Sequence, residues 1–156
     1  MQKIKSFQVD HRKLGTGMYI SRIDGDIVTY DLRFKKPNTG DLLTNSELHT
    51  VEHMLATFTR NSDIADKVVY FGPMGCQTGF YFLVRDSVTP ERVYSTIKDA
   101  VVKTIEYDGE VFGASEIECG NYRNLDLEAA KKACREYLVS LEKVEKIMDY
   151  DEVNSL

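Results

Sequence analysis

Four short segments of the chain are rich in β-branched and aromatic residues, a composition that favours β-strands. They span residues 18–23, 27–34, 68–71 and 79–85. Asp24-Gly25-Asp26 joins the first two and predicts a tight hairpin, while Gly72-Pro73-Met74-Gly75 predicts a turn between the last two. The pattern therefore indicates two pairs of neighbouring strands.

Three longer segments begin with helix-capping residues and predict α-helices. They run from the Thr44 cap to about residue 60, from the Thr89 cap to about residue 107, and from the Asp126 cap through Met148. In the third helix, an apolar stripe at helical spacing includes Cys134, Tyr137 and Met148. Glu142 and Lys146, four residues apart, are expected to form an ion pair on the solvent-exposed side. We expect Cys134 to pack in the core as a small hydrophobe.

Strands and helices occur in mixed order, with hairpins between strands, and no linker or internal repeat divides the chain. This order predicts an α+β fold in which an antiparallel β-sheet is covered by helices. We expect residues 1–156 to form a single domain, because this length suffices for one hydrophobic core.

Composition excludes several classes of partner. The formal net charge of −5 leaves no broad basic surface, so we expect no nucleic-acid partner. Apolar runs are short and the first residues resemble no secretion signal, so we expect no membrane association and a cytoplasmic location. The odd number of cysteines, three at wide spacings, indicates reduced thiols rather than disulfides.

The segment His49-Thr50-Val51-Glu52-His53 carries the strongest chemical signal. On a helix, His49, Glu52 and His53 share a face that is distinct from the apolar stripe through Val51 and Leu55. Two imidazoles one helical turn apart can bind one metal ion, and a carboxylate beside them can act as a base. The sequence therefore predicts a metal site with His49 and His53 as ligands.

The identity of the third metal ligand would distinguish between a peptidase, another metalloenzyme and a structural metal site. The local sequence pattern does not identify this ligand. Cys119 and the neighbouring acids Glu116 and Glu118 are the candidates. His-x-x-Glu-His is also the signature of inverzincin metallopeptidases, which use a distant Glu and no cysteine. A thiolate with two His instead leaves a position for a substrate oxygen, and a non-catalytic domain stabilised by metal would have four protein ligands.

Cys76 stands in the predicted turn before the fourth strand, between Gly75 and the nearby Gly79. Small neighbours on a turn would let a substrate or a metal approach the sulfur. A buried, inert thiol fits the local pattern equally well.

Several motifs in order carry a resemblance to a known family. They are His49-Thr50-Val51-Glu52-His53, Pro73-Met74-Gly75-Cys76-Gln77-Thr78-Gly79-Phe80-Tyr81 and Cys119-Gly120-Asn121-Tyr122, with Ser6-Phe7-Gln8-Val9-Asp10-His11, Asp31-Leu32-Arg33-Phe34 and Pro37-Asn38. The chain resembles the S-ribosylhomocysteine lyase (LuxS) family from Ser6 to about Leu138.

The resemblance implies a metal-dependent lyase. In that family the carbonyl group migrates along the ribose and β-elimination then releases homocysteine and 4,5-dihydroxypentane-2,3-dione, the precursor of autoinducer-2. The implied metal ligands are His49, His53 and Cys119, and the implied proton-transfer residues are Cys76 and Glu52. The metal expected from the family is iron(II), with zinc(II) or cobalt(II) as possible occupants.

The resemblance also implies a substrate pocket and a partner. Ser6, His11, Arg33 and Tyr81 match positions that line the pocket, and Arg33 could fork onto the homocysteine carboxylate. Judged without the family, Arg33 and His11 would be interpreted as surface residues. The family forms homodimers with active sites at the subunit interface, and its N-terminal segment helps to cover the pocket. Many relatives carry an acid where this chain has Tyr70.

Overall fold

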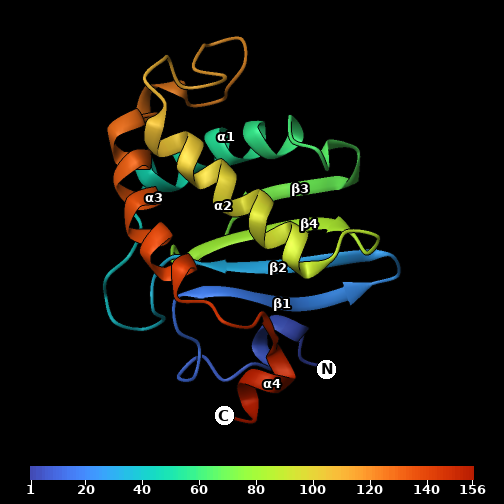
Figure 1. The fold of residues 1–156 in the computed structure, drawn as a ribbon. Coiled ribbons are helices and arrows are strands. Elements are labelled where there is room, and N and C mark those ends of the chain that lie inside the picture. The colour runs from blue at the N-terminus through green and yellow to red at the C-terminus, as the bar shows by residue number, and fades with distance from the viewer.

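The computed structural model describes residues 1–156, which form a five-stranded sheet and four α-helices (Figure 1). The strands are β1 (Gly17–Asp24), β2 (Ile27–Arg33), β3 (Val68–Pro73), β4 (Gly79–Arg85) and β5 (Met148–Asp149). The helices are α1 (Asn45–Arg60), α2 (Pro90–Glu106), α3 (Leu127–Glu142) and α4 (Tyr150–Asn154), and three short 3-10 helices lie at Lys5–Phe7, Ala65–Lys67 and Tyr122–Asn124. The α+β class predicted from the sequence is confirmed.

The sheet has the strand order β3-β4-β2-β1-β5, and all pairs are antiparallel except β1 with β5. The β1–β2 hairpin closes between Asp24 and Ile27, as predicted. Chain order would place β3 beside β2, but β4 lies there and β3 forms the edge of the sheet. This arrangement brings the turn before β4 close to the end of β2.

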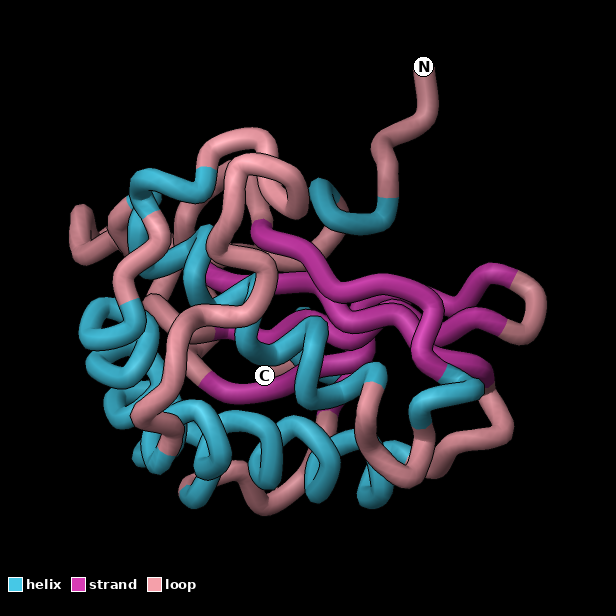
Figure 2. The backbone as a smooth tube through the Cα atoms, turned by 90° about the horizontal axis from the view of Figure 1, so that it is seen from above, coloured by secondary structure: helices cyan, strands magenta, loops and turns pink.

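The three long helices start at the predicted caps. The Thr44 and Glu47 side chains form a complete capping box at α1, and the side chains of Thr89 and Asp126 accept backbone hydrogen bonds at α2 and α3. These helices cover one face of the sheet (Figure 2). Alternate β2 residues such as Tyr30 and Leu32 point into the core that the helices and sheet share.

The other residues of β2 and β4, among them Asp31, Arg33 and Tyr81, lie on the opposite face, called the second face below. A small cluster covers part of it near β1. It consists of Val9, Leu14, Tyr19, Tyr150 and Val153. This cluster joins the N-terminal segment to α4, so both ends of the chain pack beside β1.

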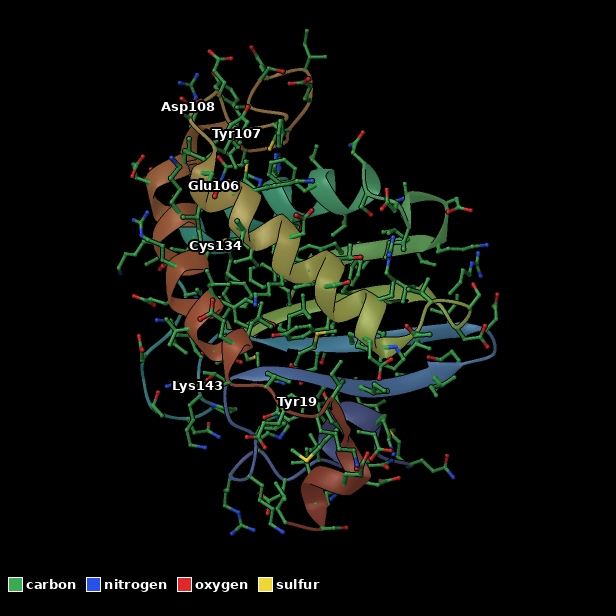
Figure 3. The ribbon with its side chains drawn as sticks, in the orientation of Figure 1. Tyr19, Glu106, Tyr107, Asp108, Cys134 and Lys143 are labelled. Carbon is green, nitrogen blue, oxygen red and sulfur yellow. The ribbon has the colours of Figure 1, made fainter.

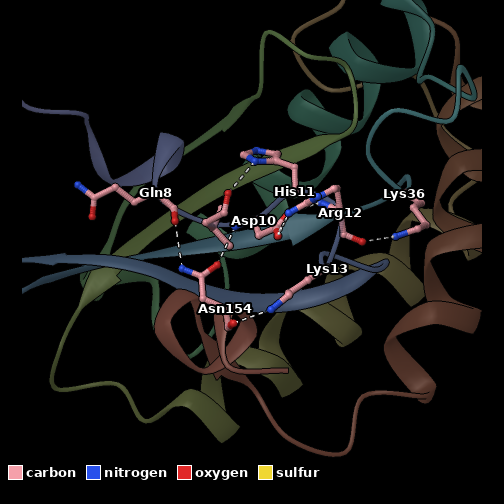
Figure 4. Close-up of polar contacts among 8 residues, drawn as sticks. Gln8, Asp10, His11, Arg12, Lys13, Lys36 and Asn154 are labelled. Atoms are coloured by element: carbon pink, nitrogen blue, oxygen red, sulfur yellow. Dashed lines mark hydrogen bonds and ion pairs between the residues drawn. The ribbon is translucent and has the colours of Figure 1, made fainter.

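Polar contacts also fasten the N-terminal segment to α4 (Figure 4). The Asn154 side chain accepts a hydrogen bond from the Asp10 backbone N–H at 2.7 Å and donates one to the Gln8 carbonyl at 3.0 Å. The Lys13 ammonium donates to the Asn154 carbonyl at 2.7 Å. The segment that contains His11 is therefore held by the C-terminal helix.

The prediction for the end of α3 was wrong. The helix ends at Glu142 instead of Met148, and Lys146 pairs with Glu152 rather than with Glu142. Met148 instead pairs with Tyr19 in β5, and α4 follows directly. Figure 3 shows Lys143 at the end of α3, close to where the chain turns back toward Tyr19.

Cys134 lies in the core, as predicted, on the side of α3 that faces α2 (Figure 3). Its side chain is fully buried, and this burial raises the pKa of its thiol to about 12. No other cysteine bonds to it, and all three cysteines are free thiols. None of the helices combines the length with the hydrophobicity that a membrane crossing requires.

Candidate active site

The structure brings His49, His53 and Cys119 together, although Cys119 is far from the histidines in the chain. The Cys119 sulfur lies 3.3 Å from Nε2 of His49 and 3.8 Å from Nε2 of His53. The three candidate ligand atoms lie within 4.8 Å of one another, and each residue is half-buried. Two nitrogens and a sulfur that converge in this way form a donor set suited to a divalent transition metal.

The other nitrogen of each imidazole is already bound. Nδ1 of His49 donates to the side-chain oxygen of Asn124 at 2.5 Å, and Nδ1 of His53 donates to the carbonyl oxygen of Phe112 at 2.7 Å. These contacts select the tautomer in which Nε2 carries a free lone pair. Both histidines are thus prepared to donate Nε2 to an ion.

Helix α1 and two loop segments build the cluster. Helix α1 places the two imidazole rings edge to face, with 4.6 Å between their centroids. The loop after α2 packs Phe112 against Phe58 of α1, with ring centroids 5.2 Å apart, which holds the Phe112 carbonyl over His53. Gly113 follows with a φ of 71°, a conformation that favours glycine.

The third ligand left open by the sequence is Cys119 rather than an acid. Glu116 and Glu118 are exposed and are absent from the cluster, and the Glu118 carboxylate accepts a hydrogen bond from Ser115. The backbone N–H of Asn121 donates a hydrogen bond to the Cys119 sulfur at 3.4 Å. A cysteine ligand departs from the inverzincin pattern.

Glu52 lies between the two histidines on α1 and is half-buried. No ion pair or hydrogen bond within the chain engages its carboxylate, so the carboxylate is free to contact a ligand. Its place on the metal-binding helix agrees with the face predicted from helical spacing.

Cys76 lies in the turn that connects β3 to β4, and its side chain is exposed. Its sulfur lies 3.0 Å from the Thr78 hydroxyl oxygen. The turn is closed by a hydrogen bond from the Gln77 N–H to the Met74 carbonyl, and Gln77 adopts a left-handed φ of 63°. The thiol is thus accessible on a defined turn, and the alternative of a buried thiol is wrong.

The two glycines near Cys76 differ in purpose. A Cβ on Gly79 would lie 2.2 Å from the Leu32 carbonyl oxygen, so this glycine permits the pairing of β4 with β2. A Cβ on Gly75 would meet no atom within 4 Å. The space around Cys76 is therefore open on the Gly75 side.

Arg33 is buried, with 2% of its side chain exposed, which contradicts the surface interpretation made without the family. Its Nε and Nη2 atoms fork onto the Asp31 carboxylate at 3.1 and 2.5 Å, and its Nη1 donates to Thr78 at 2.8 Å. The Tyr150 hydroxyl donates to the same carboxylate at 2.7 Å. Burial alone would lower the pKa of the Arg33 guanidinium, but Asp31 outweighs it and the pKa is raised.

The remaining predicted pocket residues lie on the second face or in the N-terminal segment. Tyr81 of β4 is half-buried, and burial, aided by Asp31, raises the pKa of its hydroxyl, whereas a hydrogen bond with Ser6 opposes that rise. His11 is half-buried, and its Nδ1 contacts the Val9 carbonyl at 3.0 Å. Arg33, Tyr81 and Ser6 thus gather on the side of the sheet where Cys76 lies.

Tyr70 lies on the edge strand β3 and is 52% exposed. Its ring extends along the strand over Gly72, because a Cβ on Gly72 would lie 2.1 Å from the Tyr70 hydroxyl oxygen. The side chain therefore covers backbone that an acid would leave open.

Sequence reasoning missed four residues that support the site: Asp31, Thr78, Asn124 and Tyr150. Asp31 and Thr78 belong to motifs that carry the family resemblance, but no spacing rule marks them as partners of Arg33. Asn124 and Tyr150 reach the site only through the fold. A polar residue in a strand, such as Asp31, was the one available signal.

Comparisons with known proteins agree with this geometry. The family model described as S-ribosylhomocysteinase (LuxS) matches residues 4–148. A protein of Desulfotalea psychrophila described as S-ribosylhomocysteine lyase is 40% identical over 146 residues, which cover 90% of this chain and 92% of the relative. Proteins with the same description from Clostridium beijerinckii and Borreliella afzelii are 41% and 39% identical, over 88% and 92% of this chain and 90% and 95% of those relatives.

Proposed function

The chain belongs to the S-ribosylhomocysteinase (LuxS) family, and from this premise we propose how its residues carry out the reaction of an S-ribosylhomocysteine lyase. The substrate is split into homocysteine and the autoinducer-2 precursor 4,5-dihydroxypentane-2,3-dione. The observation that carries the proposal is the convergence of His49, His53 and Cys119 at 3.3 and 3.8 Å, with both Nδ1 atoms already engaged. We propose that residues 1–156 form one lyase domain.

His49, His53 and Cys119 would hold one divalent metal ion. Iron(II) is the proposed occupant, and zinc(II) and cobalt(II) suit the same donors. When bound, such an ion would act as a Lewis acid that polarises a sugar carbonyl or hydroxyl oxygen. Three protein ligands would leave a coordination position open for that oxygen.

Cys76 and Glu52 are the proposed proton carriers. Each carbonyl shift removes a proton from the carbon beside a carbonyl group and returns one to the neighbouring carbon, so the site needs groups that can both accept and donate. The exposed Cys76 sulfur and the unpaired Glu52 carboxylate meet this need. In the final elimination a proton leaves the carbon next to the carbonyl while the carbon–sulfur bond to homocysteine breaks.

Ser6, His11, Arg33 and Tyr81 are proposed to bind the substrate. Arg33 spends three of its five N–H groups on Asp31 and Thr78, so two remain for the homocysteine carboxylate. The sequence predicted that the Arg33 guanidinium would bind the substrate carboxylate through two N–H groups. One such pair, on Nε and Nη2, already binds Asp31. Ser6 and Tyr81 could orient hydroxyl groups of the sugar.

We propose that the protein is a homodimer with active sites at the subunit interface, and that a second copy covers the second face of the sheet. Apolar side chains are exposed on or near the second face, including Phe7 at 69% and Tyr70 at 52%. Leu83 of β4 lies on the same face, between its partners Tyr70 of β3 and Thr29 of β2. The N-terminal segment projects from the side of the sheet opposite the long helices (Figure 2). An exposed apolar face of this kind is typical of protein–protein interfaces.

The dimer is tested by light scattering on the purified protein. Leu83→Glu should shift the mass from two chains toward one, whereas Val139→Glu, on the exposed side of α3, should not. A wild-type protein that is monomeric at micromolar concentration would contradict this part of the proposal.

The proposed location is the cytoplasm. All three cysteines are free, and the roles proposed for Cys76 and Cys119 require reduced sulfur. Fractionation of the source cells would test this.

The activity is tested by incubating the metal-loaded protein with S-ribosylhomocysteine and following free thiol with a chromogenic reagent. Wild type should release homocysteine, Cys76→Ala should bind the metal but release none, and Cys134→Ala should remain active. A peptide panel in parallel should stay intact. Peptide cleavage without thiol release would overturn the proposal in favour of a peptidase, and full activity of Cys76→Ala would overturn the role of that residue.

A further inference from the structure

Thr78 lies between the buried guanidinium of Arg33 and the sulfur of Cys76. Its hydroxyl oxygen is 2.8 Å from Nη1 of Arg33 and 3.0 Å from the Cys76 sulfur. Thr78 is 3% exposed, so water has little access to its hydroxyl group. Cys76 itself is exposed, and Thr78 is the one side chain that hydrogen-bonds its sulfur.

The direction of these hydrogen bonds follows from the chemistry of the groups. A guanidinium has donors only, so Thr78 must accept from Arg33. The hydroxyl proton of Thr78 then points away from Arg33, and the Cys76 sulfur is its partner on that side. A thiolate accepts such a proton better than a thiol does, because a hydrogen bond to a charged acceptor is the stronger one.

We propose that Thr78 is a positioning residue for Cys76, whose hydroxyl transmits the positive charge of Arg33 and donates the hydrogen bond that orients the sulfur as a thiolate. The inference rests on the proposed role of Cys76 as a proton carrier and adds the residue that prepares it. Thr78 touches no substrate in this role.

Arg33 is held by Asp31, which Tyr150 holds in turn, and this explains how Thr78 can be polarised in a constant direction. Asp31 of β2 binds two of its nitrogens, and Tyr150 of α4 donates to the same carboxylate at 2.7 Å. The series Tyr150, Asp31, Arg33, Thr78 and Cys76 is therefore continuous from the C-terminal helix to the exposed thiol. Buried networks of this kind hold their members in one arrangement when all of them are satisfied.

The charged and titratable groups that face Cys76 are few. Arg33 from β2 and Tyr81 from β4 interact electrostatically with it, and Asp31 and Tyr150 act on Arg33. The pKa of the Tyr81 hydroxyl is raised by burial, so Tyr81 stays neutral at pH 7. Arg33 is thus the permanently charged group near the Cys76 sulfur. The Thr78 hydroxyl connects the two through its hydrogen bonds.

The test compares Thr78→Val, which keeps the shape of the side chain and removes the hydroxyl, with Thr78→Ser, which keeps the hydroxyl. Thr29→Val is the matched control, because Thr29 is buried on the same face of the sheet, away from Cys76. The rate at which iodoacetamide alkylates Cys76 is measured against pH, and mass spectrometry identifies the modified peptide. This readout needs no substrate.

For Thr78→Val, the pH of half-maximal alkylation should rise by about one unit, and turnover at neutral pH should fall roughly tenfold, which is the effect expected of one hydrogen bond to a charged acceptor. Metal content should equal that of wild type. Thr78→Ser should restore most of the lost rate, and Thr29→Val should follow the wild-type alkylation profile.

An alkylation profile of Thr78→Val equal to that of wild type would overturn the inference. So would a loss in Thr78→Ser as large as that in Thr78→Val, because the methyl group would then be the important part of the side chain. If Cys76→Ala turned over substrate normally while the alkylation shift persisted, the role of Cys76 in catalysis would fail but the inference about Thr78 would stand.

Discussion

Nδ1 of His49 donates a hydrogen bond to the side-chain oxygen of Asn124, and the two atoms are 2.5 Å apart. Asn124 ends the short 3-10 helix that follows Cys119, so the segment that supplies the sulfur also fixes the imidazole. The metal site is therefore prepared by hydrogen bonds that exist before an ion enters. Hydrogen-bond partners of this kind orient metal-binding histidines and raise the affinity of the site for its ion.

Asn124→Ala should weaken metal binding by roughly 10- to 100-fold, because His49 loses the partner that selects its tautomer and orientation. The measurement is a competition titration of the protein against a coloured chelator. Asn121→Ala is the control, because Asn121 contacts Cys119 through its backbone N–H rather than through its side chain. Equal affinities for wild type and Asn124→Ala would mean that the contact does not prepare the site.

Gly113 packs against the imidazole of His53. A Cβ at this position would lie 3.1 Å from Nδ1 of His53, and its φ of 71° is unfavourable for alanine. Gly113→Ala should therefore disturb the hydrogen bond from His53 to the Phe112 carbonyl and lower metal affinity about tenfold or more.

Two alanine variants separate the causes of that loss. Gly40→Ala places alanine at a φ of 83° with no atom within 4 Å, so it carries backbone strain alone. Gly120→Ala lies next to Cys119 and meets no atom within 4 Å. Both should bind metal as wild type does, and a comparable loss in either would refute the role given to the His53 contact.

The sequence predicted most of the fold because its local signals were strong. Capping residues fixed the starts of α1, α2 and α3, and β-branched segments marked four strands. The predicted end of α3 was wrong because Val144 and Met148 continue the helical spacing of apolar residues although both lie beyond the helix. Val144 packs near Gly17 of β1, where a Cβ would lie 3.3 Å from it, and Met148 joins the sheet.

The same limit applies to the site. Helical spacing put His49, Glu52 and His53 on one face, but their relation to Cys119 is a tertiary contact, which the residues alone left open between a thiol and two acids. Arg33 was interpreted as a surface residue without the family because an arginine in a strand is usually solvated. Its burial depends on Asp31 and Tyr150, and Tyr150 is 117 or more positions away from both in the chain, a separation no local pattern spans.

The buried thiol of Cys134 predicts a dependence of stability on alkaline pH. Burial raises its pKa from 9.0 to about 12, so the folded state keeps a proton that the unfolded state releases. The resulting stabilisation is complete below pH 9 and is lost as the pH rises from 9 toward 12. Cys134→Ala removes this group, so the variant should lose less unfolding free energy than wild type between neutral pH and about pH 10.

Denaturant unfolding at the two pH values measures this difference. Val139→Ala is the control, because Val139 is exposed on α3 and the change removes no titratable group. A Cys134→Ala variant that shows the wild-type loss would assign the alkaline sensitivity to buried tyrosines such as Tyr30, whose pKa burial also raises to about 12.

The buried ion pair of Asp31 and Arg33 predicts an asymmetric response to mutation. Both side chains are at least 98% buried in the chain, so Arg33→Met would leave the Asp31 carboxylate with only Tyr150 as a side-chain partner. An uncompensated buried charge of this kind costs about 3–5 kcal/mol of unfolding free energy. The double variant Asp31→Leu with Arg33→Met removes both charges and should recover a large part of that loss.

Thermal or denaturant unfolding of the two single variants and the double variant gives the coupling free energy directly. A double variant that is destabilised by the sum of the two single changes would show that the pair contributes nothing to the fold. Recovery of stability without recovery of turnover would indicate that the pair is kept for function, because leucine and methionine can fill the space but cannot donate to the Thr78 hydroxyl or to a substrate carboxylate.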